Sequence, residues 1–152
     1  MKDIHIQQIE NLMKYEISHL VQDSKEEGFN FLIKLINEYE NKINVFKKTG
    51  ECLYGIFQGN TLIGIGGLNQ DPFTGDNKIG RLRRFYIAKN YRGKGLGRLL
   101  LDRIISDAKK YFTIVVLNTD TEQGDKFYTS GGFVKGKQYV GASHYLNLYK
   151  RM

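Results

Sequence analysis

Residues 81–98 read Arg-Leu-Arg-Arg-Phe-Tyr-Ile-Ala-Lys-Asn-Tyr-Arg-Gly-Lys-Gly-Leu-Gly-Arg, and this stretch decides the fold. An aromatic and aliphatic run, typical of a strand, leads into a basic turn rich in glycine. An amphipathic helical pattern opens directly behind the turn. Such a segment directs unpaired backbone N–H groups and a helix N-terminus at one place, which suits a bound phosphate. The stretch therefore predicts an anionic, nucleotide-like ligand.

The chain has 152 residues with an ordinary globular composition, so we expect a single domain over residues 1–152. No apolar run is long enough to cross a membrane, and the N-terminus lacks the pattern of a signal peptide. Cys52 is the only cysteine, which excludes an internal disulfide and favours the cytoplasm. A small apolar strand residue is the simplest role for it. The histidines have no metal-ligand spacing, so no metal is expected.

The positive charge of the chain is concentrated around the glycine turn. The formal net charge is +7, yet residues 78–110 alone hold 11 Lys or Arg and two acids. The rest of the chain, with 12 basic and 14 acidic residues, is slightly negative. A basic protein can bind nucleic acid through its phosphates. The local excess instead favours a small phosphate site, so we do not expect nucleic acid or a membrane as a partner.

Hydrophobic periodicity and turn signals divide the rest of the chain into alternating elements. Gly59-Asn60 is a hairpin signal, and Gly131-Gly132 is a signal for the end of a helix. The pattern predicts one mixed α/β domain. Its expected elements are a strand near 4–6, helices at 7–21 and 29–46, strands at 51–58 and 61–69, a loop at 71–77, a strand at 79–87, a helix at 95–110, a buried strand at 113–118, a helix at 122–130, and strands at 133–140 and 143–150.

The glycine turn fits one phosphate-loop pattern better than two others. The Walker pattern Gly-x-x-x-x-Gly-Lys-Ser/Thr does not occur. The dinucleotide pattern Gly-x-Gly-x-x-Gly fails at its third glycine, where Arg98 stands. Asp120 follows the next strand, as the ribose-binding acid of that class does, so the dinucleotide interpretation stays open. The third pattern, Arg/Gln-x-x-Gly-x-Gly/Ala, is matched by residues 92–97.

The third pattern resembles the GNAT family of N-acetyltransferases. A second match supports the resemblance, because residues 127–133, Phe-Tyr-Thr-Ser-Gly-Gly-Phe, are similar to that family's FY-x-x-x-GF signature. Strand, turn, helix, strand and signature follow in the family's order over residues 80–133. The first 75 residues fit the family's architecture but carry no motif of their own.

The resemblance implies a fold and a bound acetyl-CoA. The fold is a mostly antiparallel sheet flanked by helices, in which the parallel strands at 79–87 and 113–118 splay apart after a bulge. The pantetheine arm would lie in that gap against Phe85, Tyr86 and Ile87, where unpaired strand groups can bond an amide. Asn118 would contact it directly or through water. The pyrophosphate would lie on the N–H groups of the turn, which are those of Arg92, Gly93, Lys94, Gly95, Leu96, Gly97 and Arg98.

The resemblance also implies a chemistry without a covalent enzyme intermediate. A neutral primary amine would attack the thioester carbonyl, with a backbone N–H near Ile87 stabilising the oxyanion. Tyr128 would protonate the leaving CoA thiolate as general acid. A noncatalytic acyl-CoA-binding or sensor module on the same fold is the alternative. The sequence does not decide whether the acceptor is a small molecule or a peptide. It also does not decide whether the protein forms a homodimer, which is frequent in the family.

One position departs from the family. Members that use a carboxylate base often carry Glu where this chain has Arg81, which leaves Glu122, Asp120, Asp71 or a water chain to accept the proton. Arg81 and Arg83 alternate onto one strand face. If that face lines the acceptor groove, its field would lower the pKa of the amine and favour a substrate that carries a carboxylate or phosphate.

Overall fold

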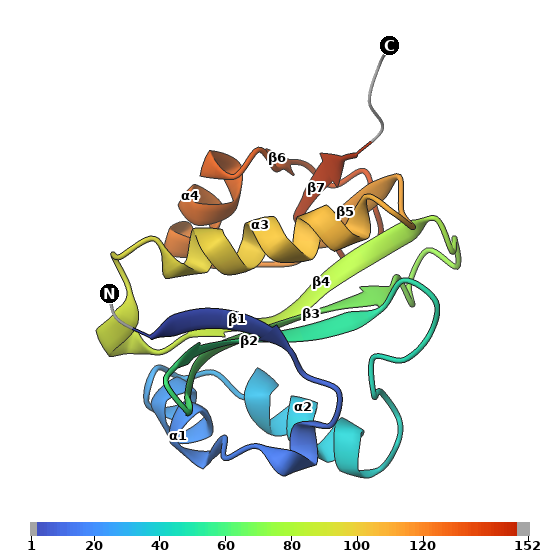
Figure 1. Ribbon diagram of the computed structural model, residues 1–152. Helices are drawn as coiled ribbons and strands as arrows, with labels where there is room; N and C mark the ends of the chain where they lie inside the picture. Colours follow the sequence, from blue (N-terminus) through green and yellow to red (C-terminus); the bar gives the residue numbers. More distant parts are fainter. Residues whose placement is uncertain (1–2, 149–152) are drawn as a thin grey trace.

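A computed structural model describes residues 3–148 of the chain. Within them one seven-stranded sheet has the order β1-β2-β3-β4-β5-β7-β6. The β4–β5 pair is parallel and the other neighbouring pairs are antiparallel. Helices α1 and α2 cover one face of the sheet, and α3 and α4 cover the other (Figure 1). The predicted mixed, mostly antiparallel sheet with flanking helices is confirmed.

Most elements lie where the sequence predicts them. Their bounds are β1 (Ile4–Gln8), a 3-10 turn η1 (Leu12–Lys14), α1 (Ser18–Glu26), α2 (Phe31–Glu40), β2 (Cys52–Gln58), β3 (Thr61–Gln70), β4 (Ile79–Ile87), a 3-10 turn η2 (Lys89–Tyr91), α3 (Leu96–Ala108), β5 (Ile114–Leu117), α4 (Glu122–Ser130), β6 (Val134–Lys135) and β7 (His144–Asn147). The glycine turn and the start of α3 therefore follow β4 directly, as residues 81–98 predict.

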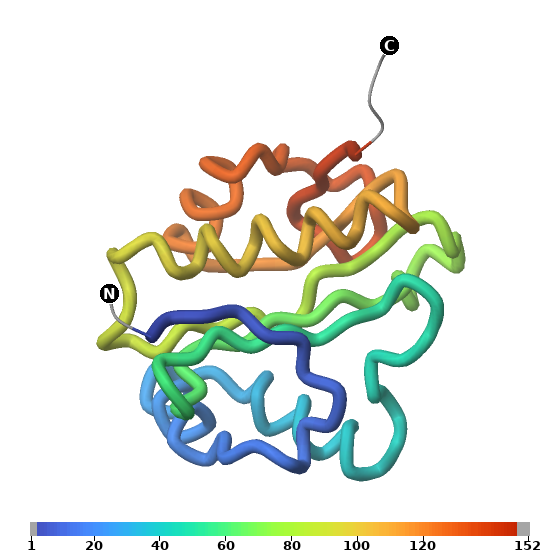
Figure 2. Tube along the Cα trace, in the orientation of Figure 1, coloured from blue at the N-terminus to red at the C-terminus, as the bar shows by residue number. Residues whose placement is uncertain are grey.

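Two hydrophobic cores lie on opposite faces of the sheet. Strand β2 alternates between them, because Leu53 and Phe57 pack toward α1 and α2 while Tyr54 and Ile56 pack toward α3. The tube in Figure 2 shows the two halves separated by the layer of β1 to β4. A strand buried on both faces reads as a continuous apolar run rather than an alternating one. The central strands thus join the two layers into one body.

Strands β4 and β5 separate after a short stretch of pairing. Pairing between them is limited to Ile79, Gly80 and Arg81 of β4. Beyond Arg81, β4 keeps only β3 as its neighbour, and the β3–β4 register shifts opposite Arg84, whose φ of 57° is left-handed. Such a bulge bends a strand and increases its twist. The splay after a bulge, which the family resemblance implies, is present.

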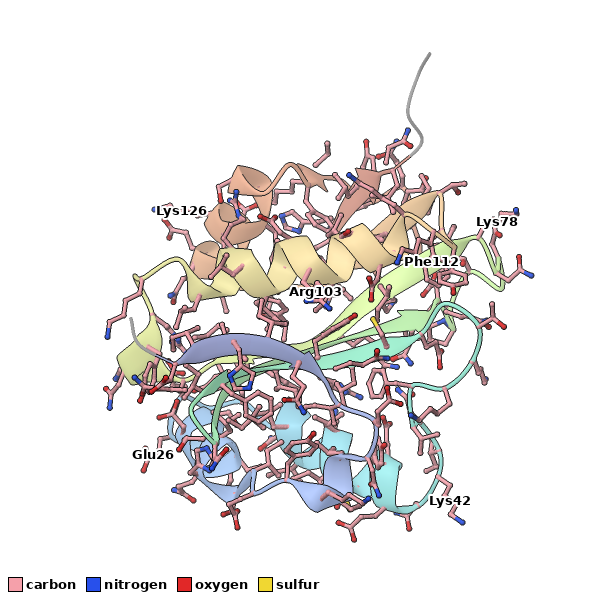
Figure 3. The ribbon with its side chains drawn as sticks, viewed as in Figure 1. Glu26, Lys42, Lys78, Arg103, Phe112 and Lys126 are labelled. Atoms are coloured by element: carbon pink, nitrogen blue, oxygen red, sulfur yellow. The ribbon has the colours of Figure 1, made fainter. Side chains whose placement is uncertain are left out.

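The closed end of this splay is packed around Phe112. Its side chain is buried beyond the C-terminal end of α3, next to the start of β4 (Figure 3). A Cβ added to Gly80 would lie only 2.9 Å from the Phe112 ring. Gly80 therefore lets the ring fill the space where β4 and β5 still pair.

Three regions differ from the sequence prediction. Of the helix expected at 29–46, only α2 (Phe31–Glu40) forms. The expected helix at 7–21 is wrong: the chain forms β1, then η1, and only then α1. Ile9, Leu12 and Leu20 still pack into the same core. Apolar residues at helical spacing can therefore be buried together without forming one continuous helix. The strand expected at 133–140 shrinks to β6 (Val134–Lys135), and residues 139–142 form a turn in which the Ala142 N–H bonds to the Tyr139 carbonyl. Of the last expected strand, residues 149–150 lie outside the described residues.

Candidate active site

One cavity of about 920 Å³ joins most of the predicted site residues. Its walls come from β4, the glycine turn, the start of α3, the end of β5, α4, and the segment leading into α2. All predicted cofactor-binding and catalytic residues line it except Lys94. These are Phe85, Tyr86, Ile87, Arg92, Gly93, Gly95, Leu96, Gly97, Arg98, Asn118 and Tyr128. The sequence thus predicts one continuous site from segments that are distant along the chain.

The glycine turn presents a run of unpaired N–H groups. Within residues 3–148 no acceptor is found for the N–H groups of residues 93–98, whereas the next one, on Leu99, bonds to the Gly95 carbonyl. Gly95 caps α3 with a left-handed φ of 81°, a conformation that costs little only for glycine. Unpaired N–H groups at a helix N-terminus carry partial positive charge. The turn has the donor arrangement that a pyrophosphate requires.

The basic side chains of the turn have different surroundings. Lys94 is exposed, with its ammonium 5.5 Å from the centre of the Tyr91 ring. Arg98 donates to Ser130 of α4 at 2.8 Å, and its buried Nε has no partner in the described part of the chain. A buried donor without an acceptor is costly. An anion at the turn would satisfy it.

Arg92 is held by the protein itself. Its guanidinium forms an ion pair with Glu27, donates to the Ile87 carbonyl at 2.9 Å, and lies over the ring of Tyr86. The hydrogen bond from Arg92 is the largest effect on Glu27 and lowers its pKa below the usual range. Arg92 therefore supports the shape of the turn, and its side chain is not directed at a phosphate.

Two acids, Asp23 of α1 and Glu27 at its C-terminal end, complete this support, and no sequence pattern indicates them. Asp23 accepts from the Tyr86 hydroxyl at 2.5 Å and from the backbone N–H of Lys89 at 3.0 Å. Glu27 also accepts from Tyr86, at 2.6 Å. The Tyr86 side chain is thus committed to the α1 layer, which leaves only its backbone for a ligand. No local pattern links α1 to a turn more than 60 residues away.

Tyr128 lies in an aromatic cluster on α4. Its ring contacts Phe85, Phe127 and Phe133, with ring centres 5.0 to 6.1 Å apart. No hydrogen bond to its hydroxyl occurs among the described residues, and the side chain borders the cavity. Burial raises the pKa of the Tyr128 hydroxyl, so it keeps its proton at neutral pH. A protonated hydroxyl with no protein acceptor is available to a ligand.

Helix α4 is fixed to the sheet by a buried histidine. His144 of β7 lies 2.7 Å from Asp125 of α4 through Nε2, and 2.7 Å from Ser143 through Nδ1. Ser143 in turn accepts from the N–H of Thr119, next to Asn118. Asn118 is exposed to the cavity at the end of β5, as predicted. This chain of contacts holds Tyr128 and Asn118 on one frame.

Arg81 does not act as the sequence suggests. Its side chain is only 4% exposed, its Nε lies 2.7 Å from Asp71, and it bonds the carbonyls of Val140 and Gly141. Burial works to raise the pKa of Asp71, but the hydrogen bonds from Arg81 and Thr74 prevail and lower it. The expectation that Arg81 adds a free positive charge to the groove is therefore wrong, since Asp71 neutralises it.

Arg83 differs from Arg81 in its surroundings. Its side chain is partly buried, borders the cavity, and forms no hydrogen bond or ion pair within residues 3–148. Burial and then the neighbouring Arg84 lower the pKa of the Arg83 guanidinium. Of the three acids considered as bases, Asp71 is paired with Arg81 and Glu122 with Lys126, and Asp120 alone borders the cavity.

The described part of the chain offers neither a metal-binding cluster nor a reactive thiol. No group of three His, Cys, Asp or Glu side chains there could hold a metal ion. Cys52 is buried in β2, and burial raises its pKa to about 12, which suits an unreactive core residue. No helix between residues 3 and 148 has the length and hydrophobicity that crossing a membrane requires.

The chain is similar in fold to several solved structures. A protein from Exiguobacterium sp. 255-15 assigned as an acetyltransferase is 26% identical with a TM-score of 0.84, over 95% of this chain and 93% of that one. A GNAT-family acetyltransferase from Staphylococcus aureus Mu50 is 22% identical with a TM-score of 0.77, over 96% and 99%. A Salmonella typhimurium structure that holds acetyl-CoA as its cofactor is 15% identical with a TM-score of 0.70, over 99% and 96%, and shares the fold.

The family model of the acetyltransferase (GNAT) family matches residues 14–133. This range includes β4, the glycine turn, β5 and α4, and so contains the cavity walls described above except those after residue 133. It also extends into the N-terminal helices, where the sequence offers no motif. The chain belongs to the GNAT acetyltransferase family.

Proposed function

We propose that this protein is a single-domain N-acetyltransferase that moves the acetyl group of acetyl-CoA to a primary amine. The observation that carries the proposal is the run of unpaired N–H groups at residues 93–98 beside the open edge of β4. The first feature suits a pyrophosphate, and the second suits the amides of a pantetheine arm. The buried Nε of Arg98, which has no partner in residues 3–148, is a further donor for a phosphate.

The residues of the cavity have distinct tasks in this reaction. The acceptor amine attacks the thioester carbonyl carbon, the C–S bond breaks, and the amine loses a proton to solvent. Backbone N–H groups of β4 near Ile87 stabilise the oxyanion, a contribution of about 3 kcal/mol for one donor. Tyr128 donates its proton to the leaving thiolate and regains one from solvent.

Tyr128→Phe tests this assignment. Removing the hydroxyl leaves the aromatic packing against Phe85 and Phe133 in place. We expect kcat to fall about 10²-fold or more, the usual contribution of a general acid, with little change in acetyl-CoA affinity. The measurements are thiol release with a panel of amines and calorimetric titration of acetyl-CoA.

The control is Tyr111→Phe, which removes a hydroxyl from an exposed tyrosine outside the cavity and should leave both quantities unchanged. Equal kcat in the wild type and Tyr128→Phe would contradict the role of Tyr128. Acetyl-CoA binding without thiol release for any amine would instead favour the noncatalytic sensor.

A further inference from the structure

The cavity has a further wall that the acetyl-CoA site does not explain. Lys34, Arg83, Phe29, Phe31 and Phe73 contribute to this wall, and we name these five residues the acceptor wall. It extends from Phe31, whose ring centre lies 6.1 Å from that of Tyr86, to Phe73, which lies against Arg81. Lys34 is on α2, Arg83 is on β4, and Phe73 is in the loop after β3. Strand residues advance by about 3.3 Å, so Arg83 lies roughly 13 Å along β4 from Ile87, with the glycine turn farther on. A pyrophosphate at the turn therefore does not reach Arg83.

The acceptor wall carries positive charge without a matching acid. Three arginines along the cavity are already paired within the protein: Arg81 with Asp71, Arg84 with Glu38, and Arg92 with Glu27. Lys34 and Arg83 have no such pair in the described part of the chain. Of the cavity-lining residues, Asp120 is the only acid, and it follows β5 rather than belonging to the acceptor wall.

The unpaired charge of Arg83 indicates a binding role because its side chain is partly buried. A guanidinium removed from water is costly unless a partner replaces its hydration. The pair Arg84–Glu38, 3.2 Å apart, lies next to it and uses the carboxylate of α2 that could otherwise serve Arg83. Arg84 and Arg83 both border the cavity, but only Arg84 forms an ion pair with Glu38 of α2. The protein thus keeps one fork of donors unpaired at the site.

The aromatic members of the acceptor wall add an apolar surface. Phe29 and Phe31 lie with their ring centres 5.4 Å apart, and Phe73 is 57% exposed although it is a large apolar side chain. The guanidinium carbon of Arg81 also lies 4.6 Å from the centre of the Phe73 ring, and this contact holds the ring beside Arg81. An exposed aromatic side chain at a cavity is typical of a binding site.

We infer that the acceptor is a small amine that also carries an anionic group, a carboxylate or a phosphate, and an apolar portion, and that Arg83 and Lys34 bind the anion. This inference rests on the proposed function and narrows its substrate. Polycationic acceptors, such as polyamines, are excluded by repulsion from the same two side chains. The anion holds the amine at a fixed distance from β4, and the aromatic rings hold the apolar portion.

Thiol release with acetyl-CoA and matched amines tests the inference. The pairs are phenylalanine with phenylalaninamide, and O-phosphoethanolamine with ethanolamine, with spermidine as the polycation. We expect kcat/KM to be at least tenfold higher for the anionic member of one pair than for its neutral partner, and spermidine to be inactive. The pair that shows the preference distinguishes a carboxylate from a phosphate.

Variants of Arg83 test whether this side chain causes the preference for anionic amines. Arg83→Gln should lower the ratio of kcat/KM between anionic and neutral partners about tenfold, and Arg83→Glu should invert it. The ratio is measured within each variant, so a partial loss of folded protein cancels. Lys109→Gln, the same charge loss at an exposed position beyond α3 and outside the cavity, should leave the ratio unchanged.

The outcomes separate the two proposals. Thiol release that favours neutral amines or spermidine, or a ratio that Arg83→Gln leaves unchanged, overturns this inference and leaves the proposed function standing. Acetyl-CoA binding without release for any amine overturns the proposed function, and this inference with it.

Discussion

Arg81 has a structural role at the position where some family members carry a catalytic carboxylate. The guanidinium joins three segments, because it contacts Asp71 of the loop after β3 and two carbonyls near residue 140. It lies where β4 and β5 stop pairing, at the closed end of the splay. Arg81 thus stabilises the wall of the cavity, and the free charge at the site comes from Arg83.

Loss of one partner of this buried pair should strongly destabilise the fold. In Asp71→Asn the Arg81 charge remains buried without its carboxylate, so we expect the free energy of unfolding to fall by about 3–5 kcal/mol, measured by urea denaturation. The double variant Asp71→Leu, Arg81→Met removes both charges and should recover much of the loss. A single variant as stable as the wild type would contradict the structural role of the pair.

The same pair determines part of the acid sensitivity. The folded-state pKa of Asp71 is lowered below its unfolded value of about 3.9. Its stabilisation is therefore complete above about pH 4 and is lost as the pH falls through the folded-state pKa. Between pH 5 and pH 3 the stability of the wild type should fall more than that of the double variant, as measured by thermal unfolding across this range. Parallel curves would contradict the assignment.

At the residue scale the sequence predicts what is encoded locally. Gly95 and Tyr128 belong to short motifs whose spacing is visible in the chain. Glu27 and Arg83 depend on tertiary contacts: Glu27 is found only because α1 lies beside the turn, and Arg83 is distinguished from Arg81 only by which acids lie nearby. Whether an arginine forms an ion pair within the protein decides its role, and no sequence pattern predicts which arginines are paired.

At the scale of elements, the sequence predicts strand β4, the turn that follows it and helix α2, but not the path of residues 7–21. The strand, the glycine turn and α3 are adjacent in the chain, so local signals fix their order. The region at 7–21 carries apolar residues at helical spacing, yet β1 pairs with β2 and takes its first residues into the sheet. Tertiary pairing overrides the local preference there.

The glycine turn should bind its ligand through its backbone, which a matched pair of variants tests. A Cβ at Gly95 meets no protein atom within 4 Å, so Gly95→Ala costs only the left-handed conformation, about 1–2 kcal/mol. The proposed phosphates would occupy that open space, so acetyl-CoA affinity should fall at least tenfold, measured by titration calorimetry.

Gly59→Ala is the control for this backbone strain. Gly59 also has a left-handed φ, of 58°, and an equally open Cβ position, but it lies in the β2–β3 hairpin away from the cavity. We expect a similar loss of stability in urea and an unchanged acetyl-CoA affinity. Equal affinity loss in the two variants would show that strain, and not ligand contact, is responsible.

At the scale of the whole molecule, the two cores share one sheet. Leu20 is fully buried in the core under α1 and α2, and Leu100 is fully buried in the core under α3. Strands β2 and β3 send side chains into both, so neither layer keeps its partner surface if the other unfolds. The sequence shows the apolar positions, but only the fold shows which core each belongs to.

Because of this shared sheet we expect the molecule to unfold in one cooperative step. Leu20→Ala and Leu100→Ala should each lower the free energy of unfolding by about 2–5 kcal/mol, and each should shift the same single transition. Far-ultraviolet circular dichroism and tyrosine fluorescence would then report coincident midpoints, with calorimetric and van't Hoff enthalpies equal. A second transition that only one variant moves would show that the layers unfold separately, and would contradict a single domain.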